Sequence, residues 1–188
     1  MPCTIQTTPI KDLLVIEPKV FPDSRGWFYE SYKASDYQKA GIVEIFVQDN
    51  HSLSCRGTLR GLHFQTAPHA QGKLVRVTRG CIWDVAIDLR HNSATFGQWH
   101  GLELSAENRL VFWIPAGFAH GFISLEDDTE LQYKCTAEYC AAADAGLHWN
   151  SPLLNIPWPD LGLPPLLSPK DEQLPPFDPS SVYFKDFA

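Results

Sequence analysis

Short apolar runs separated by turn residues fill the middle of the chain and limit its fold more than any other feature. The runs KLVRV at 73–77 and IWDVAIDL at 82–89 are rich in Val and Ile, and similar runs follow at GQWHGLELS, RLVFWIP, HGFISL and ELQYKCT. Such residues favour strands, and many short strands with turns between them are typical of antiparallel sheets. The sequence therefore predicts a mainly β protein, built as an antiparallel sandwich or barrel.

Two local patterns refine this prediction. The segment TRGC joins the runs 73–77 and 82–89 and predicts a hairpin turn around Gly80. Within 82–89, apolar residues at every second position alternate with Asp84, Ala86 and Asp88, which predicts one buried face and one open face.

Helical signals are few. ASDYQKAG at 34–41 offers Ser35 as an N-cap and Gly41 as a stop, so we expect a peripheral helix of about two turns. Nine of the 15 prolines occur from Pro152 onward, which predicts extended backbone with at best a short helix. Because this segment, about 152–188, is also rich in Leu, we expect it to pack over the barrel, and residues 1–188 to form a single domain.

Composition excludes several classes of function. A formal net charge of -7 argues against a nucleic-acid surface, although Arg25, Arg60 and Lys73 could form a local site for a small anion. The five cysteines contain no CxxC pair and are odd in number, as in reduced cytosolic proteins. The start MPCTIQTTPIKDLL has no apolar run behind a basic end. We therefore expect a cytoplasmic protein that binds neither nucleic acid nor a membrane.

Isolated histidines in a β-rich chain are similar to those of cupins, many of which hold a metal. Metal cupins usually place an HxH pair in one strand, so that two ligands point inward together. His63 and His120 each stand alone, and the other histidines show no ligand spacing. The sequence thus favours acid/base chemistry without a metal; a metal-dependent cupin oxygenase, with ligands from distant segments, stays a minor alternative.

Eight segments, in order along the chain, resemble the dTDP-4-dehydrorhamnose 3,5-epimerase family. They are EPKVFPDSRGWFYESY, FVQDNHS, LRGLHFQ, AQGKLVRVTRG, FGQWHGLELSAEN, WIPAGFAHGF, LQYKCT and LSPKD. The resemblance implies a cupin-like jelly-roll barrel with short peripheral helices, no cofactor, and a homodimer that exchanges N-terminal strands. It also implies an isomerase of dTDP-rhamnose biosynthesis that inverts C3 and C5 of dTDP-4-dehydro-6-deoxy-D-glucose through an enolate.

The resemblance assigns four catalytic residues. His63 matches the general base, Asp171 the carboxylate that orients it, Lys73 the cation beside the C4 oxygen, and Tyr133 the acid on the opposite face. Inversion next to a ketone requires these roles: a proton is removed, the enolate is stabilised, and a proton returns to the other face. Taken singly, the four would be a hydrogen-bonded histidine, a surface lysine, a sheet tyrosine and a loop carboxylate.

Seven further positions match substrate contacts of the family: Arg25, Glu30, Gln48, Asn50, Arg60, His120 and Tyr139. The first two resemble a segment that reaches over from the partner subunit. Arg60 and His120 match contacts around the diphosphate and sugar, Tyr139 lines the site, and Gln48 and Asn50 share one strand face.

Strict alternation raises one difficulty and the sequence shows two departures from the family. Arg60 and His63 would lie on opposite strand faces, so both reach one pocket only if Gly61 allows a bulge or twist. Ser151 follows WN where the family often has an acidic residue, and 140–146 (CAAADAG) is rich in alanine. A mono-epimerase acting at C3 or C5, and a non-catalytic carbohydrate-binding cupin, therefore stay as alternatives.

Overall fold

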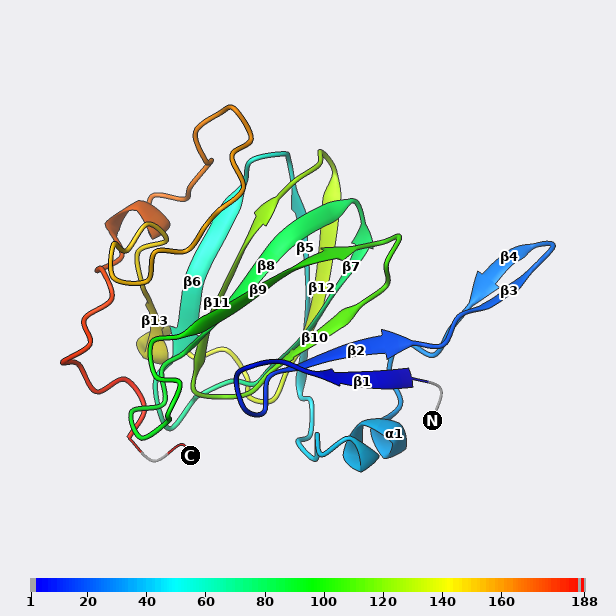
Figure 1. The fold of residues 1–188 in the computed structure, drawn as a ribbon, viewed down its shortest axis with the longest axis horizontal. Coiled ribbons are helices and arrows are strands. Elements are labelled where there is room, and N and C mark those ends of the chain that lie inside the picture. Colours follow the sequence, from blue (N-terminus) through cyan, green and yellow to red (C-terminus); the bar gives the residue numbers. More distant parts are fainter. Residues whose placement is uncertain (1–2, 186, 188) are drawn as a thin grey trace.

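The computed structural model describes residues 3–185 and residue 187, and it consists of two facing antiparallel sheets (Figure 1). In the six-stranded sheet the order is β1 (Cys3–Thr7), β2 (Leu14–Pro18), β10 (Val111–Ile114), β7 (Lys73–Arg79), β12 (Thr129–Cys135), β5 (Gln48–Ser54). In the five-stranded sheet it is β13 (Asp144–Gly146), β6 (Leu59–Gln65), β11 (Phe118–Ser124), β8 (Cys81–Asp88), β9 (Trp99–Ser105). The mainly β, jelly-roll class is confirmed, and the described strands form a sandwich rather than a closed barrel. Positions 1, 2, 186 and 188 of the expected domain lie outside the described residues.

Apolar side chains fill the space between the two sheets. Phe112 and Val75 of the six-stranded sheet meet Ile82, Leu104 and Phe122 of the five-stranded sheet in one buried cluster. Burial of this kind contributes about 25 cal/mol for each Å² of apolar surface removed from water. The cluster sets the spacing of the sheets and therefore the width of any cleft between them.

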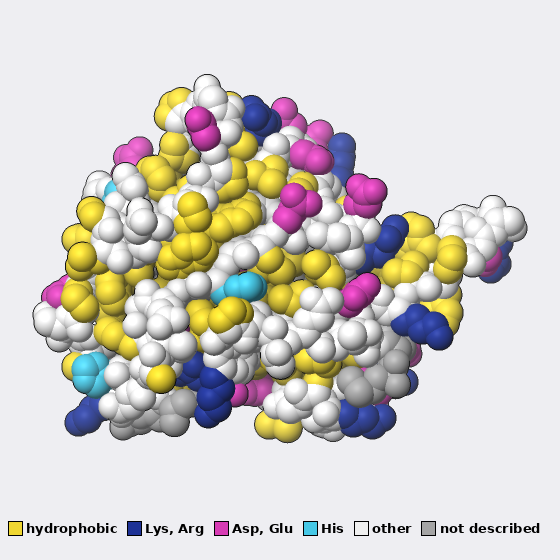
Figure 2. Space-filling view, viewed as in Figure 1, with side chains coloured by type: hydrophobic (Ala, Val, Ile, Leu, Met, Phe, Trp, Pro, Cys, Tyr) yellow, Lys and Arg dark blue, Asp and Glu magenta, His cyan; other side chains and the backbone are white. Residues whose placement is uncertain are grey.

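The C-terminal segment covers the outer face of the five-stranded sheet. Phe177 and Phe184 are buried there against Val85 and Ile87 of β8. The segment is tied to the sandwich by backbone bonds, among them one from the Leu59 N–H to the Leu166 carbonyl and one from the His91 N–H to the Phe184 carbonyl. It includes a short 3-10 turn, η2 (Asp171–Gln173). Figure 1 shows this segment beside β6 and β13, and Figure 2 shows apolar side chains gathered on the same part of the surface.

The hairpin expected around Gly80 is wrong. β7 belongs to the six-stranded sheet and β8 to the five-stranded sheet, so the chain changes sheets at this turn instead of pairing the two strands. Gly80 has a φ of +74°, and a Cβ there would meet the Thr129 hydroxyl oxygen at 2.4 Å. The turn itself was recognisable, but turn residues do not specify which strand becomes the partner.

The open face expected on the run 82–89 is also wrong, because both faces of β8 are covered. Asp84 and Asp88 are each 0% exposed on the inner side, and the other face lies under the C-terminal segment. Each carboxylate has a partner: Asp84 contacts His120, and Asp88 accepts hydrogen bonds from Arg90. Alternation correctly separated two faces and failed to show that both are buried.

The peripheral helix is present, with a different start. α1 spans Ala34–Lys39 and its N-cap is Lys33, without a side-chain cap, so the expected cap at Ser35 is wrong. Gly41, with a φ of +89°, follows the helix end as expected. A one-turn 3-10 segment, η1 (Ala141–Ala143), precedes β13. Across residues 3–185, no helix has the length and apolar character needed to cross a membrane.

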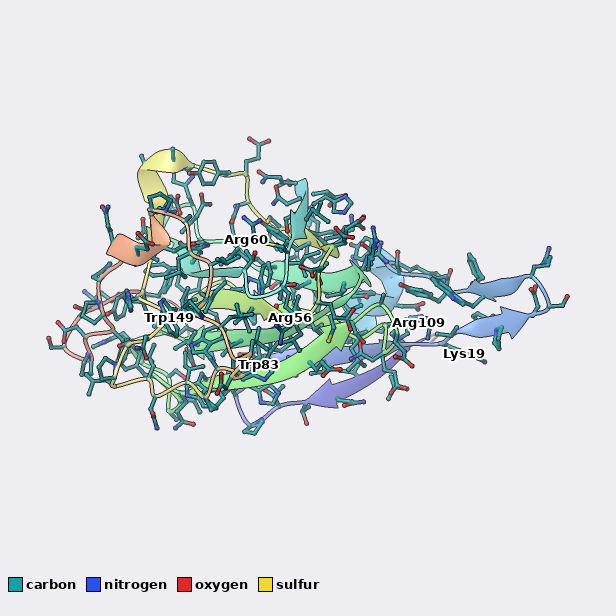
Figure 3. The ribbon with its side chains drawn as sticks, turned by 90° about the horizontal axis from the view of Figure 1, so that it is seen from above. Lys19, Arg56, Arg60, Trp83, Arg109 and Trp149 are labelled. Atoms are coloured by element: carbon teal, nitrogen blue, oxygen red, sulfur yellow. The ribbon has the colours of Figure 1, made fainter. Side chains whose placement is uncertain are left out.

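A two-stranded hairpin projects from the sandwich (Figures 1 and 3). It consists of β3 (Phe21–Asp23) and β4 (Gly26–Phe28), with Lys19 and Arg109 near its base in Figure 3. Its aromatic side chains are solvent-exposed: Trp27 is 56% exposed and Phe28 is 64% exposed. Exposed apolar surface of this kind often marks a site of interaction.

A bulge at Gly61 is confirmed. On β11 the partner of His63 is His120 and the partner of Arg60 is Phe122, so β6 carries one extra residue over this stretch. Gly61 has a φ of +120°, and a Cβ there would meet the Gly121 Cα at 2.6 Å. The bulge turns Arg60 and His63 toward the same side of the sheet.

We predict that Gly61→Ala destabilises the protein strongly, because the methyl group requires both a disfavoured backbone conformation and a shift of the adjacent strand. The free energy of unfolding from urea titration should fall by about 3 kcal/mol. Gly26→Ala is the matched control: its φ is +136°, but no atom lies within 4 Å of the added carbon. It should cost only the backbone strain, about 1–2 kcal/mol, and equal losses in the two variants would contradict the steric account.

Candidate active site

A cleft between the two sheets collects most of the expected site residues. One cavity of about 520 Å³ is lined by His63, Lys73, Tyr133, Asp171, Arg60 and His120. An adjoining cavity of about 390 Å³ shares His63, Lys73 and Tyr133 and adds Gln48, Asn50 and Tyr139. Nine of the eleven positions suggested by the sequence thus border one continuous site.

His63 is held by a carboxylate from the other end of the chain. Its Nε2 lies 2.5 Å from Oδ1 of Asp171, which is 3% exposed. The Asp171 N–H donates to the Ser168 hydroxyl, which fixes the turn that presents the carboxylate. Burial alone would raise the pKa of Asp171, but the hydrogen bond and charge of His63, together with hydrogen bonds to Ser168 and the Gly61 backbone, outweigh burial, so the pKa is lowered. An ionised Asp171 holds Nε2 and leaves Nδ1 as the ring nitrogen for a substrate.

Lys73 and Tyr133 enter the cleft from the opposite sheet. The Lys73 Nζ donates to the His63 carbonyl at 3.4 Å, which places the ammonium beside the backbone of that residue. Burial lowers the pKa of Lys73 and raises the pKa of Tyr133. A phenol with a raised pKa keeps its proton at neutral pH, as a proton donor must.

Arg60 and His120 border the first cavity, as expected. The Arg60 guanidinium donates to the Ser54 hydroxyl and the Leu53 carbonyl. His120 contacts both carboxylate oxygens of Asp84, a residue that the sequence analysis did not single out as functional. Because polar and apolar residues alternate in the run 82–89, the sequence analysis expected the Asp84 carboxylate to face solvent.

The adjoining cavity contains a second set of linked polar groups. The Gln48 side-chain amide donates to the Asn50 side-chain oxygen at 3.0 Å, so the two do share a strand face. The Tyr139 hydroxyl and the Lys170 ammonium both donate to Oδ2 of Asp144. Neither Lys170 nor Asp144 was proposed from the sequence, although Lys170 directly precedes Asp171 in the quoted segment LSPKD.

Arg25 and Glu30 do not reach this cleft within the chain. Arg25 is exposed at the turn of the projecting hairpin and pairs with Asp23 at 2.6 Å, while Glu30 lies 3.7 Å from Lys33. In Figure 3 the hairpin extends away from Arg60. Within the described part of the chain, no group of three His, Cys, Asp or Glu side chains is arranged to hold a metal ion.

Fold and cleft together define the site of a cupin-like enzyme, in which His63 on one sheet faces Tyr133 and Lys73 on the other. The sequence profile of the family described as dTDP-4-dehydrorhamnose 3,5-epimerase matches residues 7–179. The chain belongs to the dTDP-4-dehydrorhamnose 3,5-epimerase family, an isomerase family.

Individual members of the family are similar to this chain in sequence and structure over nearly its full length. The dTDP-4-dehydrorhamnose 3,5-epimerase of Escherichia coli K12 is 52% identical over 169 residues, which cover 89% of this chain and 90% of the relative. The crystal structure of the Elizabethkingia anophelis enzyme has a TM-score of 0.90 at 46% identity, covering 94% of this chain and 97% of that one. The crystal structure of the Legionella pneumophila enzyme, in complex with dTDP-4-keto-L-rhamnose, has a TM-score of 0.86 at 47% identity. The match covers 94% of this chain and 99% of that one.

The lowered pKa of Asp171 predicts a pH-dependent contribution to stability. The ionised form of Asp171 stabilises the folded protein at pH values above its unfolded-state pKa of about 3.9. This contribution disappears as the pH falls through the lower folded-state pKa. Urea unfolding should therefore show Asp171→Asn less stable than wild type by about 1–2 kcal/mol at about pH 7 and pH 5, and by less at about pH 3.

The neighbouring exposed carboxylate supplies the control for this experiment. Glu172→Gln changes the next residue of the same turn and should leave stability unchanged at each pH. A constant difference between Asp171→Asn and wild type at all three pH values would show that Asp171 acts through packing and not through its charge.

Proposed function

We infer that the chain epimerises dTDP-4-dehydro-6-deoxy-D-glucose at C3 and C5, giving dTDP-4-dehydro-L-rhamnose. The observation that carries this inference is the placement of His63 and Tyr133 on facing sheets across one cleft. A sugar ring between them presents one face to each side chain, which is the arrangement that inversion requires. The Legionella relative, bound to dTDP-4-keto-L-rhamnose, supports the same reaction.

His63 is the base in this proposal. Asp171 holds Nε2, so Nδ1 takes the proton from the carbon beside the C4 ketone, and the carboxylate stabilises the resulting imidazolium. Removing this proton leaves negative charge on the C4 oxygen. The Lys73 ammonium, beside His63, stabilises that charge.

Tyr133 completes the inversion by returning a proton from the other wall. Its part-buried phenol, with a raised pKa, is protonated at neutral pH. Each inversion moves one proton from carbon to His63 and one from Tyr133 to carbon, and solvent restores both groups before the next. Arg60 and His120 bind the anionic part of the substrate, while Gln48, Asn50 and Tyr139 border the remainder of the site.

The test is proton exchange in deuterated water with dTDP-4-dehydro-6-deoxy-D-glucose as substrate. Deuterium at both C3 and C5 is expected for wild type, whereas deuterium at one carbon would indicate a mono-epimerase and none would indicate a binding protein. His63→Ala should lower exchange and inversion together by about 100- to 10,000-fold, because it removes the base.

Tyr133→Phe should separate the two measurements. The variant keeps the ring and loses the donated proton, so exchange continues through His63 while inversion falls sharply. Tyr139→Phe is the matched control, since this tyrosine borders the second cavity and is 58% exposed. If exchange and inversion fall together in Tyr133→Phe, Tyr133 is not the acid on the opposite face.

We further propose that the enzyme is a cytoplasmic homodimer with exchanged N-terminal hairpins, its C-terminal segment forming part of the same domain. Two observations support exchange: the hairpin displays Trp27 and Phe28 to solvent, and it carries Arg25 away from its own cleft. In a dimer, Arg25 of the partner subunit would supply the missing cation at the nucleotide end. Free cysteines among the described residues fit a reducing compartment.

Mixed dimers test the exchange. Arg25→Ala and His63→Ala should each have low activity alone, but a heterodimer of the two contains one site with both residues intact. Co-expression should therefore restore about a quarter of wild-type activity, because about half of the dimers are mixed and each has one complete site. Activity no greater than the sum of the two variants would show that each subunit builds its site without its partner's hairpin.

A further inference from the structure

A second histidine–carboxylate pair lies beside the first in the cleft. His120 is the cross-strand partner of His63, and its Nε2 lies 2.9 and 3.0 Å from the two carboxylate oxygens of Asp84. His120 is 7% exposed and borders the cavity, whereas Asp84 is 0% exposed and lies beneath it. The function proposed above gives Asp84 no role.

Lys73, on the opposite sheet, borders the same cavity as His120, whose ring the Asp84 carboxylate contacts. Burial lowers the pKa of Lys73, and an ionised Cys135 and the Asp84 carboxylate oppose this effect. Burial raises the pKa of Cys135, so that thiol is neutral at neutral pH. Burial likewise raises the pKa of Asp84, and His120 and Lys73 oppose that rise. The carboxylate therefore interacts with two groups that the reaction needs, one by direct contact and one through its charge.

We propose that Asp84 is a positioning residue, whose buried carboxylate fixes the His120 ring and supplies the negative charge that keeps Lys73 an ammonium ion in the cleft. The proposal rests on the proposed function for the role of Lys73. A cation in a site shielded from water is unfavourable unless an opposite charge lies near it. Without that charge, Lys73 would lose its proton at a lower pH and could no longer stabilise an enolate.

Asp88, on the same strand as Asp84, is a buried carboxylate whose contacts lie outside the cleft. It is also 0% exposed, but it accepts hydrogen bonds from the Arg90 guanidinium and from the hydroxyls of Ser93 and Thr95. Arg90 stays charged at any working pH, and none of these residues borders the cleft. Asp88 is therefore a matched control for the loss of a buried negative charge.

Other charged and titratable groups surround Lys73, so the test must isolate Asp84. The groups whose charges act on the Lys73 ammonium are Cys135, Asp84, Asp144 and Lys170. The further charged or titratable side chains that border the same cavity are Cys55, Arg60, His63, His120, Tyr133 and Asp171. Asp84→Asn changes one charge in this set and keeps the shape of the side chain.

The main experiment measures the protonation of Lys73 without substrate. Competitive labelling with acetic anhydride over a range of pH, followed by peptide mass spectrometry, gives the midpoint at which Lys73 becomes reactive. Asp84→Asn should lower this midpoint by about one pH unit relative to wild type, and Asp88→Asn should leave it unchanged. A midpoint that stays in place in Asp84→Asn, or that moves equally in both variants, overturns the proposal.

Kinetics separate this proposal from the proposed function. If wild type exchanges the substrate's protons with solvent, the alkaline limb of the rate should move to lower pH in Asp84→Asn and not in Asp88→Asn. If wild type shows no exchange, the proposed function fails while the titration of Lys73 still decides the electrostatic role of Asp84.

A measurement on wild type covers the case in which Asp84→Asn does not fold. The proposal requires Asp84 to be ionised at neutral pH, despite its burial. Carbon NMR of protein labelled at the aspartate carboxyl carbon should then show every aspartate in the ionised form at about pH 7. An aspartate that remains protonated at this pH, and ionises only on raising it, would overturn the proposal.

Discussion

The hydrogen bond between His63 and Asp171 is the contact on which the rest of the site depends. It joins residues 108 positions apart, one on β6 of the five-stranded sheet and one in the C-terminal segment. It forms only if the bulge at Gly61 turns the imidazole inward and the apolar side chains of the C-terminal segment dock on the outer face. Chemistry in the cleft is therefore coupled to packing on the opposite side of the same sheet.

The sequence predicted the β class and most of the cleft because those features follow from local composition and from a family resemblance. The bulge was predictable because Gly61 separates two polar residues that strict alternation would send to opposite faces. The sheet assignment of β7 and β8 was not predictable, since the turn at Gly80 fits a hairpin and a change of sheet equally well. Long-range pairing decides that choice.

The residues that the sequence analysis missed have their partners far away in the chain. Asp84 meets His120, and Lys170 meets Asp144, across separations that no local pattern reports. Asp84 was taken for a solvent-facing carboxylate because Val85 and Ile87 looked like the core face of the strand. These two residues face the C-terminal segment instead, and Asp84 faces the interior between the sheets. The prediction of an N-cap at Ser35 was wrong because α1 begins at Ala34, so Ser35 lies inside the helix and Lys33 is the N-cap.

The late position of the covering segment has a consequence for biosynthesis. All the strands of both sheets are encoded before residue 147, so a nascent chain of that length presents the outer face of β8, with Val85 and Ile87, to solvent. Such a surface is a target for chaperones and for aggregation. A chain that ends there thus exposes this apolar face and also lacks Asp171, the partner of His63.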